Sequence, residues 1–307
     1  MRLLKPKPLK TGATLGVVAP SEWLPEANLK AGCLALEGLG FRVVVHPQCF
    51  LKDHRLAGAD KARADALHDV FLDPTVDGII CARGGAGAQR TAAHLDMNII
   101  RKNPKVFCGY SDITLLLHAL QQHAGLVTFH GPMLTTFQKP NPFSAEHFRA
   151  VLGGATPILP FEKALPLRTG EAEGALTGGN LCLLTTLLGT PDDFDTDGKI
   201  LFIEDVDEHP YTLDRMLWHL HRAGKLKNIK GLIIGEMLNI TENKPENPWG
   251  HSFFDVVREL LPPETPCVAN APCGHGLDLA TLPLGGRVKL KVGTDSTHLA
   301  LLEPAVL

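Results

Sequence analysis

Long apolar segments are missing from this 307-residue sequence, because nowhere do 18 uninterrupted apolar residues occur, as a membrane-spanning helix requires. A strong net charge is also missing: the formal charge is −3, which offers no basic surface for nucleic acid. The seven cysteines are scattered and form no Cys-x-x-Cys pair, which argues against a disulfide framework and favours a reducing compartment. Residues 1–10 are basic but lack the apolar stretch of a secretory signal. We therefore expect a cytoplasmic protein that binds neither membranes nor nucleic acid.

Hydrophobic residues make up 44% of the chain and charged residues 21%, which is typical of a globular protein, and the length suits two domains. The first half alternates strand and helix patterns, which predicts a parallel sheet covered on both faces. The second half is mixed and ends in a predicted antiparallel hairpin, with Val288, Leu290 and Val292 on one face. The predicted organisation is an N-terminal α/β domain (1–150), a linker (151–175) and a C-terminal β-rich α+β domain (176–307). We expect the active site at the interface of the two domains.

Ser111 lies two residues after the end of a predicted strand at residues 105–109 and begins a predicted helix. A serine at a sharp strand-to-helix turn has an exposed hydroxyl, and the helix start supplies free N–H groups. A nucleophilic hydroxyl and a tetrahedral oxyanion both need these surroundings. The full G-x-S-x-G pattern is absent, since Ile113 occupies the place of its second glycine. The alternative interpretation is that Ser111 only caps the helix.

A glycine-rich turn at residues 83–87 follows the predicted strand 77–82. The backbone of such a turn can approach a ligand closely. The turn fails as a dinucleotide-binding signature, because Arg90 stands where the third glycine belongs. It suits the second wall of an oxyanion hole opposite Ser111. A phosphate-binding enzyme that uses this turn ranks last among our hypotheses.

Glu204 ends the apolar strand 199–203 and begins an acidic run at 204–208. The run lacks the glycine turn and the distal glutamate of a calcium loop, and acidic decoration of the next helix explains its later members. Glu204 itself abuts the strand end, where it can be partly buried. His219 and His221 point to different faces of one helix, so we expect no metal and no cofactor.

His275 lies between two glycines, which give its backbone room to bring the ring across a domain interface. The order Ser111, Glu204, His275 is also the chain order of catalytic triads on α/β-hydrolase sheets. Each residue alone is ambiguous, and together they indicate one site.

The sequence resembles the LD-carboxypeptidase family of serine peptidases, which also contains microcin C immunity peptidases. The resemblance covers essentially the whole chain through ordered blocks. These blocks are residues 16–21, 82–85, 109–114, 130–132, 178–181, 201–205, 211–217, 274–276 and 282–285. One departure is Ala86, where many members carry an aromatic residue.

The resemblance implies that Ser111 is the nucleophile, His275 the general base and Glu204 its partner. It also implies that the backbone N–H groups of Gly85 and Asp112 form the oxyanion hole. The family's fold pairs a parallel α/β domain with a β-rich domain, commonly in a homodimer. Its typical substrate is a cytoplasmic muropeptide that loses a terminal D-alanine during peptidoglycan recycling.

A carboxypeptidase also needs a cationic or N–H-rich pocket for the terminal carboxylate of its substrate. Arg83 is a candidate, although pairing with a nearby acid is the alternative. Asn180 is a second candidate for substrate contact, with helix capping equally plausible. Two rival functions stay open: cleavage of a microcin-type peptidyl-nucleotide, and ligand binding without catalysis by a two-lobed protein.

Overall fold

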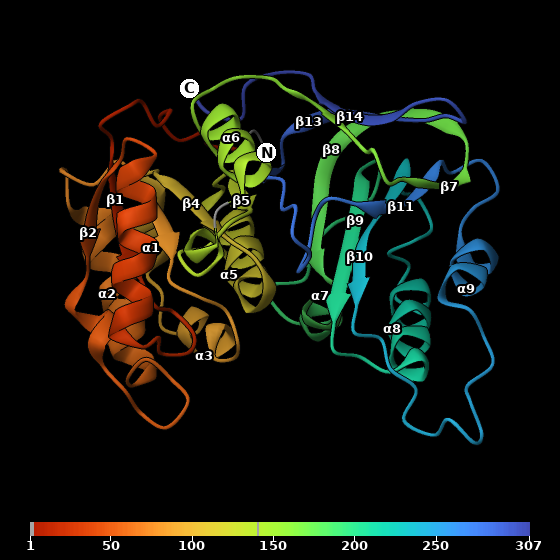
Figure 1. The fold of residues 1–307 in the computed structure, drawn as a ribbon, viewed down its shortest axis with the longest axis horizontal. Helices are drawn as coiled ribbons and strands as arrows, with labels where there is room; N and C mark the ends of the chain where they lie inside the picture. Colours follow the sequence, from red (N-terminus) through yellow and green to blue (C-terminus); the bar gives the residue numbers. More distant parts are fainter. Residues whose placement is uncertain (1–2, 140) are drawn as a thin grey trace. The chain divides into compact units, whose positions relative to one another are not determined.

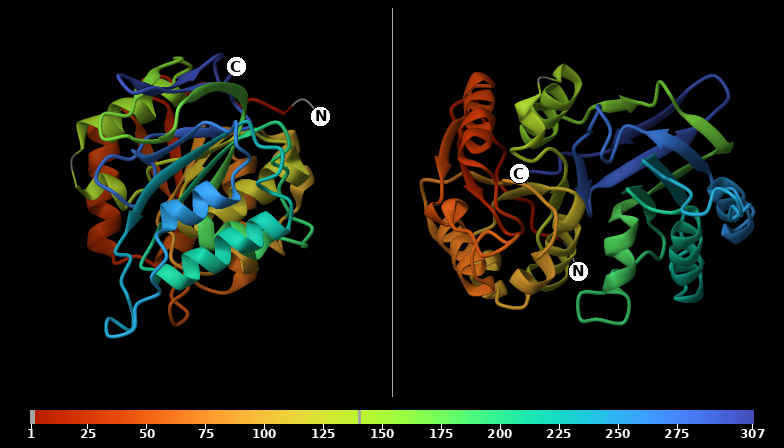
Figure 2. Two further views of the ribbon diagram at one scale, coloured as in Figure 1. Left: turned by 90° about the vertical axis from the view of Figure 1, so that its right-hand side faces the viewer. Right: turned by 60° about the horizontal axis from the view of Figure 1, so that its bottom comes forward.

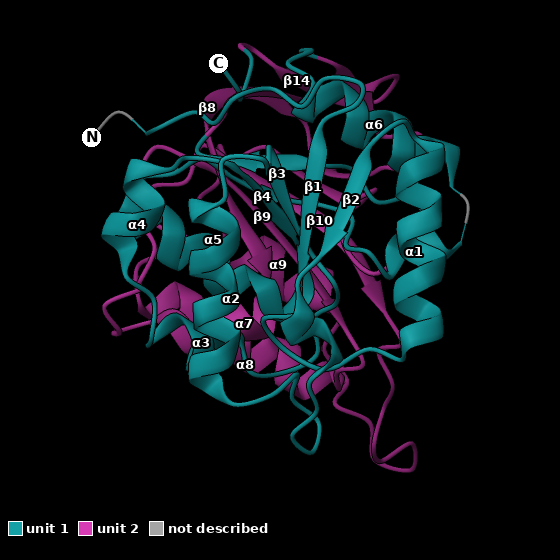
Figure 3. Ribbon diagram, turned by 90° about the vertical axis from the view of Figure 1, so that its left-hand side faces the viewer, with its two compact units in different colours: residues 1–156, 278–285, 304–307 teal, residues 157–277, 286–303 magenta. Residues whose placement is uncertain are grey.

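The computed structural model describes residues 3–139 and 141–307. The chain divides into two compact units, which Figure 3 distinguishes by colour. Unit 1 comprises Met1–Thr156, Asp278–Gly285 and Pro304–Leu307, and unit 2 comprises Pro157–Leu277 and Gly286–Glu303. These bounds differ from the domain limits expected at 150 and 176. Residues 151–175 contain strands of the second sheet, and two segments near the C-terminus, 278–285 and 304–307, belong to unit 1. Within the described residues no helix has the length and apolar character needed to cross a membrane.

Unit 1 is built on a six-stranded sheet of order β12-β5-β4-β3-β1-β2. The five strands from the N-terminal half are parallel, and β12 joins β5 in antiparallel pairing. The central strands are buried along their whole length, as expected for a parallel sheet covered on both faces. The strands are β1 (Thr14–Val18), β2 (Arg42–Val45), β3 (Gly78–Cys81), β4 (Val106–Gly109), β5 (Thr128–His130) and β12 (Leu282–Leu284).

Helices α1 and α6 lie on one side of this sheet and α2, α4 and α5 on the other (Figure 3). From β1 the next strand, β2, is added on one side of the sheet, whereas β3, β4 and β5 are added in turn on the other side of β1. This change of direction places a topological switch point between β1 and β3. The helices are α1 (Glu26–Gly38), α2 (Asp60–Leu72), α3 (Ala88–Ala92), α4 (Met97–Lys102), α5 (Thr114–Ala119) and α6 (Pro142–Leu152), with 3₁₀ turns η1 (Pro47–Phe50), η2 (Ser111–Ile113) and η4 (Thr136–Gln138) and a π-helical turn η3 (Leu120–Ala124).

Unit 2 is built on an eight-stranded sheet of order β6-β14-β13-β8-β9-β10-β11-β7. Strands β8 to β11 are mutually parallel, and antiparallel strands flank them on both sides. The predicted terminal hairpin is confirmed as β13 and β14. The strands are β6 (Ile158–Pro160), β7 (Leu165–Arg168), β8 (Gly170–Asn180), β9 (Ile200–Val206), β10 (Gly231–Leu238), β11 (Cys267–Ala271), β13 (Arg287–Val292) and β14 (Thr297–Leu301).

Three helices, α7 (Leu181–Leu187), α8 (Pro210–Arg222) and α9 (Phe253–Leu260), cover one side of the unit 2 sheet (Figures 1 and 2). Helix α8 buries Leu213, Leu217 and Leu220, the stripe expected from its 3.6-residue period. Because β8 to β11 are parallel, their carboxyl ends share one edge of the sheet. The parallel α/β class of unit 1 and the β-rich mixed class of unit 2 are as predicted.

Candidate active site

Ser111 lies in unit 1 at the carboxyl end of β4, and its backbone is strained. Its φ of 63° is positive, which non-glycine residues rarely adopt, and the chain then enters η2 and α5. No side-chain hydrogen bond caps either of these turns, so the structure does not support the interpretation of Ser111 as a helix cap. A Cβ on Gly84 would lie 3.0 Å from the Ser111 Cβ, closer than such atoms usually approach, so the glycine lets the two loops lie close together. The geometry is that of a nucleophile elbow without its second glycine.

The Asp112 side chain ties the nucleophile turn to two neighbouring loops. Its Oδ2 accepts hydrogen bonds from Ser21 Oγ at 2.6 Å and from the Ala88 N–H at 2.8 Å. Burial raises the pKa of this carboxyl, and the two hydrogen bonds oppose that rise. The loops after β1, β3 and β4 are thus joined at the switch point of the sheet, where ligands of open α/β folds bind.

The turn at Arg83–Gly87 exposes Gly85 and Ala86 at its tip. Gly85 has a φ of 107°, and a Cβ there would collide with the Glu22 carboxylate at 2.4 Å. Glu22 is buried and pairs with Arg55 at 2.5 Å and with Arg83 at 3.2 Å. Arg83 therefore makes the acid pairing that was the alternative to substrate contact, while 36% of its side chain stays exposed.

A fully buried arginine, Arg63, hydrogen-bonds the same turn and the loop after β1. Its guanidinium donates to the carbonyls of Pro20 and Gly87 and to Thr91 Oγ1, and it pairs with Asp60 at 2.6 Å. An arginine that satisfies its donors on backbone carbonyls fixes the shape of the loops that supply them. Sequence reasoning missed Arg63, since a charged residue inside a helix pattern gives no sign of being buried.

Glu204 and His275 lie together in unit 2, at the carboxyl ends of β9 and β11. The distance from His275 Nδ1 to Glu204 Oε2 is 2.8 Å, and Glu204 is completely buried. A carboxylate only accepts hydrogen bonds, so Nδ1 carries the proton and Nε2 is left to accept one. Burial disfavours the charged imidazole, but the hydrogen bond from His275 to Glu204 and the neighbouring acidic charges outweigh it and raise the pKa of His275 above 6.5.

Glycines allow the His275 loop to lie close to the strands. A Cβ on Gly274 would lie 3.0 Å from Glu204, and one on Gly276 would occupy the space of the Glu236 carboxylate. Gly235 of β10 has no room for a Cβ either, because it faces the Cys273 carbonyl. The predicted need for backbone room around His275 thus has a specific cause, close packing against two glutamates.

Asn180 caps α7 and orients Asp205. Its Oδ1 accepts from the Leu183 N–H at 3.1 Å, and its Nδ2 donates to Asp205 Oδ1 at 2.9 Å. Burial raises the pKa of Asp205 to about 6, against the effect of its hydrogen-bond donors. The capping role of Asn180 is present in the structure, and a contact with substrate stays a prediction.

The two halves of the predicted triad lie in different units: Ser111 with Gly85, Asp112 and Arg83 in unit 1, and Glu204, His275 and Asn180 in unit 2. Within the described residues no group of three or more His, Cys, Asp and Glu side chains is placed to hold a metal ion.

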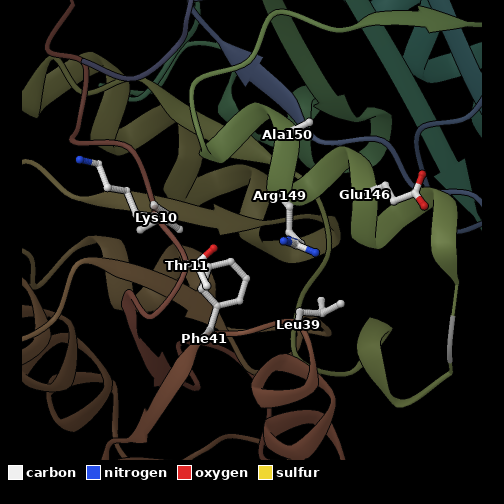
Figure 4. Close-up of a pocket in the computed structure, with 8 residues that line it drawn as sticks. Lys10, Thr11, Leu39, Phe41, Glu146, Arg149 and Ala150 are labelled. Carbon is white, nitrogen blue, oxygen red and sulfur yellow. The ribbon is translucent and has the colours of Figure 1, made fainter.

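A separate surface pocket of about 350 Å³ in unit 1 is shown in Figure 4. Thr11 precedes β1 and Phe41 precedes β2, so this pocket lies at the amino ends of the strands, the edge opposite to Ser111. It is lined by Leu9, Lys10, Thr11, Leu39, Phe41, Glu146, Arg149 and Ala150. The pocket takes no part in the site described above.

A strained serine, a glycine-rich turn beside it and a buried glutamate–histidine pair are the parts of a serine hydrolase. Family models of the LD-carboxypeptidase N-terminal domain and C-terminal domain match residues 15–131 and 173–290. The chain belongs to the LD-carboxypeptidase family and is a serine-type carboxypeptidase.

Individual relatives agree with this assignment. A probable murein peptide carboxypeptidase of Bacillus subtilis is 39% identical over 309 residues, covering 98% of this chain and 95% of the relative. The crystal structure of muramoyltetrapeptide carboxypeptidase from Oxalobacter formigenes matches with a TM-score of 0.84 and 32% identity, covering 93% of this chain and 98% of that one. MccF in complex with glutamyl sulfamoyl guanosine matches with a TM-score of 0.90 at 24% identity, over 99% and 100% of the two chains, and shares the fold.

Proposed function

We propose that this chain hydrolyses the L,D-peptide bond that releases the terminal D-alanine of cytoplasmic muropeptides, with Ser111, His275 and Glu204 as its catalytic triad. The observation that carries the proposal is the 2.8 Å hydrogen bond from His275 to the buried Glu204, which leaves Nε2 as a base. The strained turn at Ser111 supplies the matching nucleophile. The murein peptide and muramoyltetrapeptide substrates in the names of two relatives support the substrate class.

The chain passes from unit 2 into unit 1 shortly after the proposed base. Asp278 and Leu279 belong to unit 1, where they are held by Asn141 at 3.1 Å and by Ser144 at 2.9 Å. His275 precedes Asp278 by only three residues, which span at most about 11 Å of extended chain. The loop that carries the base is therefore tethered to the unit that carries the nucleophile.

The reaction begins when Ser111 Oγ attacks the scissile carbonyl carbon and its proton passes to His275 Nε2. The N–H groups of Gly85 and Asp112 bind the oxyanion, and Glu204 stabilises the imidazolium. When the C–N bond breaks, the leaving amine of D-alanine takes the proton from Nε2. Water then attacks the acyl-serine ester carbon and gives a proton to Nε2. When the ester C–O bond breaks, Ser111 Oγ takes that proton from Nε2, which restores the serine hydroxyl and the neutral base as the acid departs.

Two further properties belong to the proposal. We extend to this chain the homodimeric state that is common in the family. Arg83 and Asn180 serve as candidate contacts for the substrate, the first through the exposed part of its guanidinium beside the glycine turn.

The test is D-alanine release from a murein tetrapeptide by the Ser111→Ala variant, with Ser296→Ala in the exposed β13–β14 turn as the matched control. We expect Ser111→Ala to lose at least about 10³-fold in kcat, since triad nucleophiles act as a unit with their base, and Ser296→Ala to match the parent. Activity of Ser111→Ala within tenfold of the parent would remove Ser111 as nucleophile.

Cleavage of a microcin-type peptidyl-nucleotide is the second candidate, favoured by the likeness to MccF-type structures. A MccF-like protein from Bacillus anthracis str. Ames matches with a TM-score of 0.87 and 28% identity over 98% of this chain. Hydrolysis of such a conjugate, with no D-alanine released from murein peptides, would favour this candidate over the first.

A further inference from the structure

An exposed aromatic cluster stands at the carboxyl ends of β9 and β10, outside the glutamate–histidine pair. We define the Trp249 cluster as His209, Tyr211, Arg215 and Trp249. The centroid of the Tyr211 ring lies 6.4 Å from that of the Trp249 ring and 5.6 Å from that of the His209 ring. The Arg215 guanidinium carbon lies 5.2 Å from the Tyr211 ring centroid. Trp249 is 43% exposed, which is unusual for so large an apolar side chain.

The loop that carries Trp249 is held in a defined conformation. The Thr241 N–H donates to the Glu208 carbonyl at 3.1 Å, and the Thr241 carbonyl lies 2.7 Å from His209 Nδ1. Nearer the ring, the backbone N–H of Trp249 donates to Glu242 at 2.9 Å. Hydrogen bonds thus hold the backbone of this loop, and the Trp249 indole lies beside Tyr211 with much of its surface in water. Order without burial is what a preformed binding surface requires.

The Trp249 cluster lies on the same sheet edge as the proposed catalytic pair. Strand β9 ends at Val206, two residues after Glu204, and the cluster begins at His209, five residues after Glu204. Because Glu204 is the hydrogen-bond partner of His275, the cluster begins within about 18 Å of chain from the residue that holds the base. The three residues on the N-terminal side of the cut bond span about 10 Å in extended conformation. A group attached to the N-terminus of a tetrapeptide cut at its C-terminal bond can reach the cluster.

We propose that Tyr211 and Trp249 bind the sugar ring of a muramoyl peptide, an inference that rests on the proposed function and extends it to the far end of the substrate. A pyranose ring has a face of C–H bonds that packs on an aromatic ring, while its hydroxyls stay solvated or meet polar neighbours such as Arg215. Tyrosine and tryptophan suit such contacts because they provide large, rigid area with few rotatable bonds. The cluster therefore distinguishes sugar-bearing substrates from free peptides.

The test compares kcat/KM for a muramoyl tetrapeptide with that for the same tetrapeptide without the sugar. For Trp249→Ala we expect a loss of about three- to tenfold on the muramoyl substrate, mainly in KM, because aromatic contacts of this kind have modest energies. On the free tetrapeptide we expect a change of less than about twofold. Trp249→Phe keeps an aromatic ring and should recover most of the loss.

Trp218 supplies the matched control, because it is also exposed (38%) and lies two helical turns beyond Tyr211 on α8. We expect Trp218→Ala to behave as the parent on both substrates, and the melting temperature of each variant to show that it is folded. An equal effect of Trp249→Ala on both substrates, or none on either, would overturn the inference while leaving the proposed function intact.

Two other outcomes distinguish failure of the proposed function from failure of the sugar-binding inference. If the parent releases D-alanine from neither substrate, the proposed function fails, and the inference fails with it. If Trp249→Ala weakens hydrolysis of a peptidyl-nucleotide and leaves the muramoyl substrate unchanged, the cluster binds a nucleobase, and the sugar assignment is wrong.

Discussion

Replacement of Glu204 by glutamine alters the buried hydrogen bond to His275 and removes a negative charge beside it. The side chain keeps its size and stays in a fully buried position, 2.8 Å from His275 Nδ1. The amide no longer carries the charge that stabilises an imidazolium. If its NH₂ group turns toward Nδ1, the imidazole proton must move to Nε2, and that nitrogen can no longer accept the proton of Ser111.

The expected loss follows from the burial of this pair. Breaking a buried charged hydrogen bond costs about 3–5 kcal/mol, and each 1.36 kcal/mol corresponds to a factor of ten in rate. We therefore expect Glu204→Gln to lower kcat by about 10²–10⁴-fold. The pKa of His275 should also fall, because burial, which lowers it, persists while the raising effect of Glu204 is removed.

The assay is D-alanine release as a function of pH, with thermal unfolding to show that the variant is folded. Glu264→Gln, the same chemical change in the exposed loop before β11, is the control and should match the parent. Activity of Glu204→Gln within tenfold of the parent would refute the reasoning. So would a pH–activity profile whose acidic limb lies at higher pH in the variant than in the parent.

The remaining predictions concern the titration of the base and the loop contacts of Asp112. Because the pKa of His275 is raised and a general base must be neutral, kcat/KM should fall as the pH drops through a value above 6.5. A fall of kcat/KM that begins only below pH 6.5 would contradict His275 as the base. By linkage, the stabilisation from the protonated pair is fully present below pH 6.5 and is lost as the pH rises through the folded-state pKa. Asp112→Ala removes the acceptor shared by Ser21 and Ala88, so we expect kcat to fall about tenfold or more with KM nearly unchanged, whereas Asp112→Asn, which keeps an acceptor, should retain most activity. Equal activities of the two Asp112 variants would show that these contacts do not position the oxyanion hole.

Local patterns were sufficient to predict the elements that carry the candidate site. The parallel sheet of unit 1 follows from short buried runs alternating with helices, and the residues after each strand were then the natural candidates. Ser111 and the glycines at 84, 85 and 87 were found in this way. The pairing of Glu204 with His275, 71 positions apart, followed from their order and from a family resemblance, since no local pattern encodes it.

Long-range contacts account for what the sequence could not predict. Strand β12 has only three residues, and it joins the first sheet through pairing with β5 more than 150 positions earlier. The parallel run β8 to β11 in unit 2 was read only as mixed structure, because strand direction depends on connections rather than on composition. The side chain of Asp112 was overlooked because its two donors, Ser21 and Ala88, come from other loops.

Reaction of Ser111 with a fluorophosphonate, followed by mass spectrometry of the modified peptide, tests the central claim most directly. The probe needs an activated serine and no knowledge of the natural substrate. We predict stoichiometric labelling of Ser111 in the parent and a rate at least about 10²-fold lower in His275→Ala, because the imidazole of unit 2 must remove the proton of the hydroxyl in unit 1. Labelling of Ser111 at the same rate in both proteins, or no labelling of Ser111 in the parent, would contradict a triad formed by Ser111, His275 and Glu204.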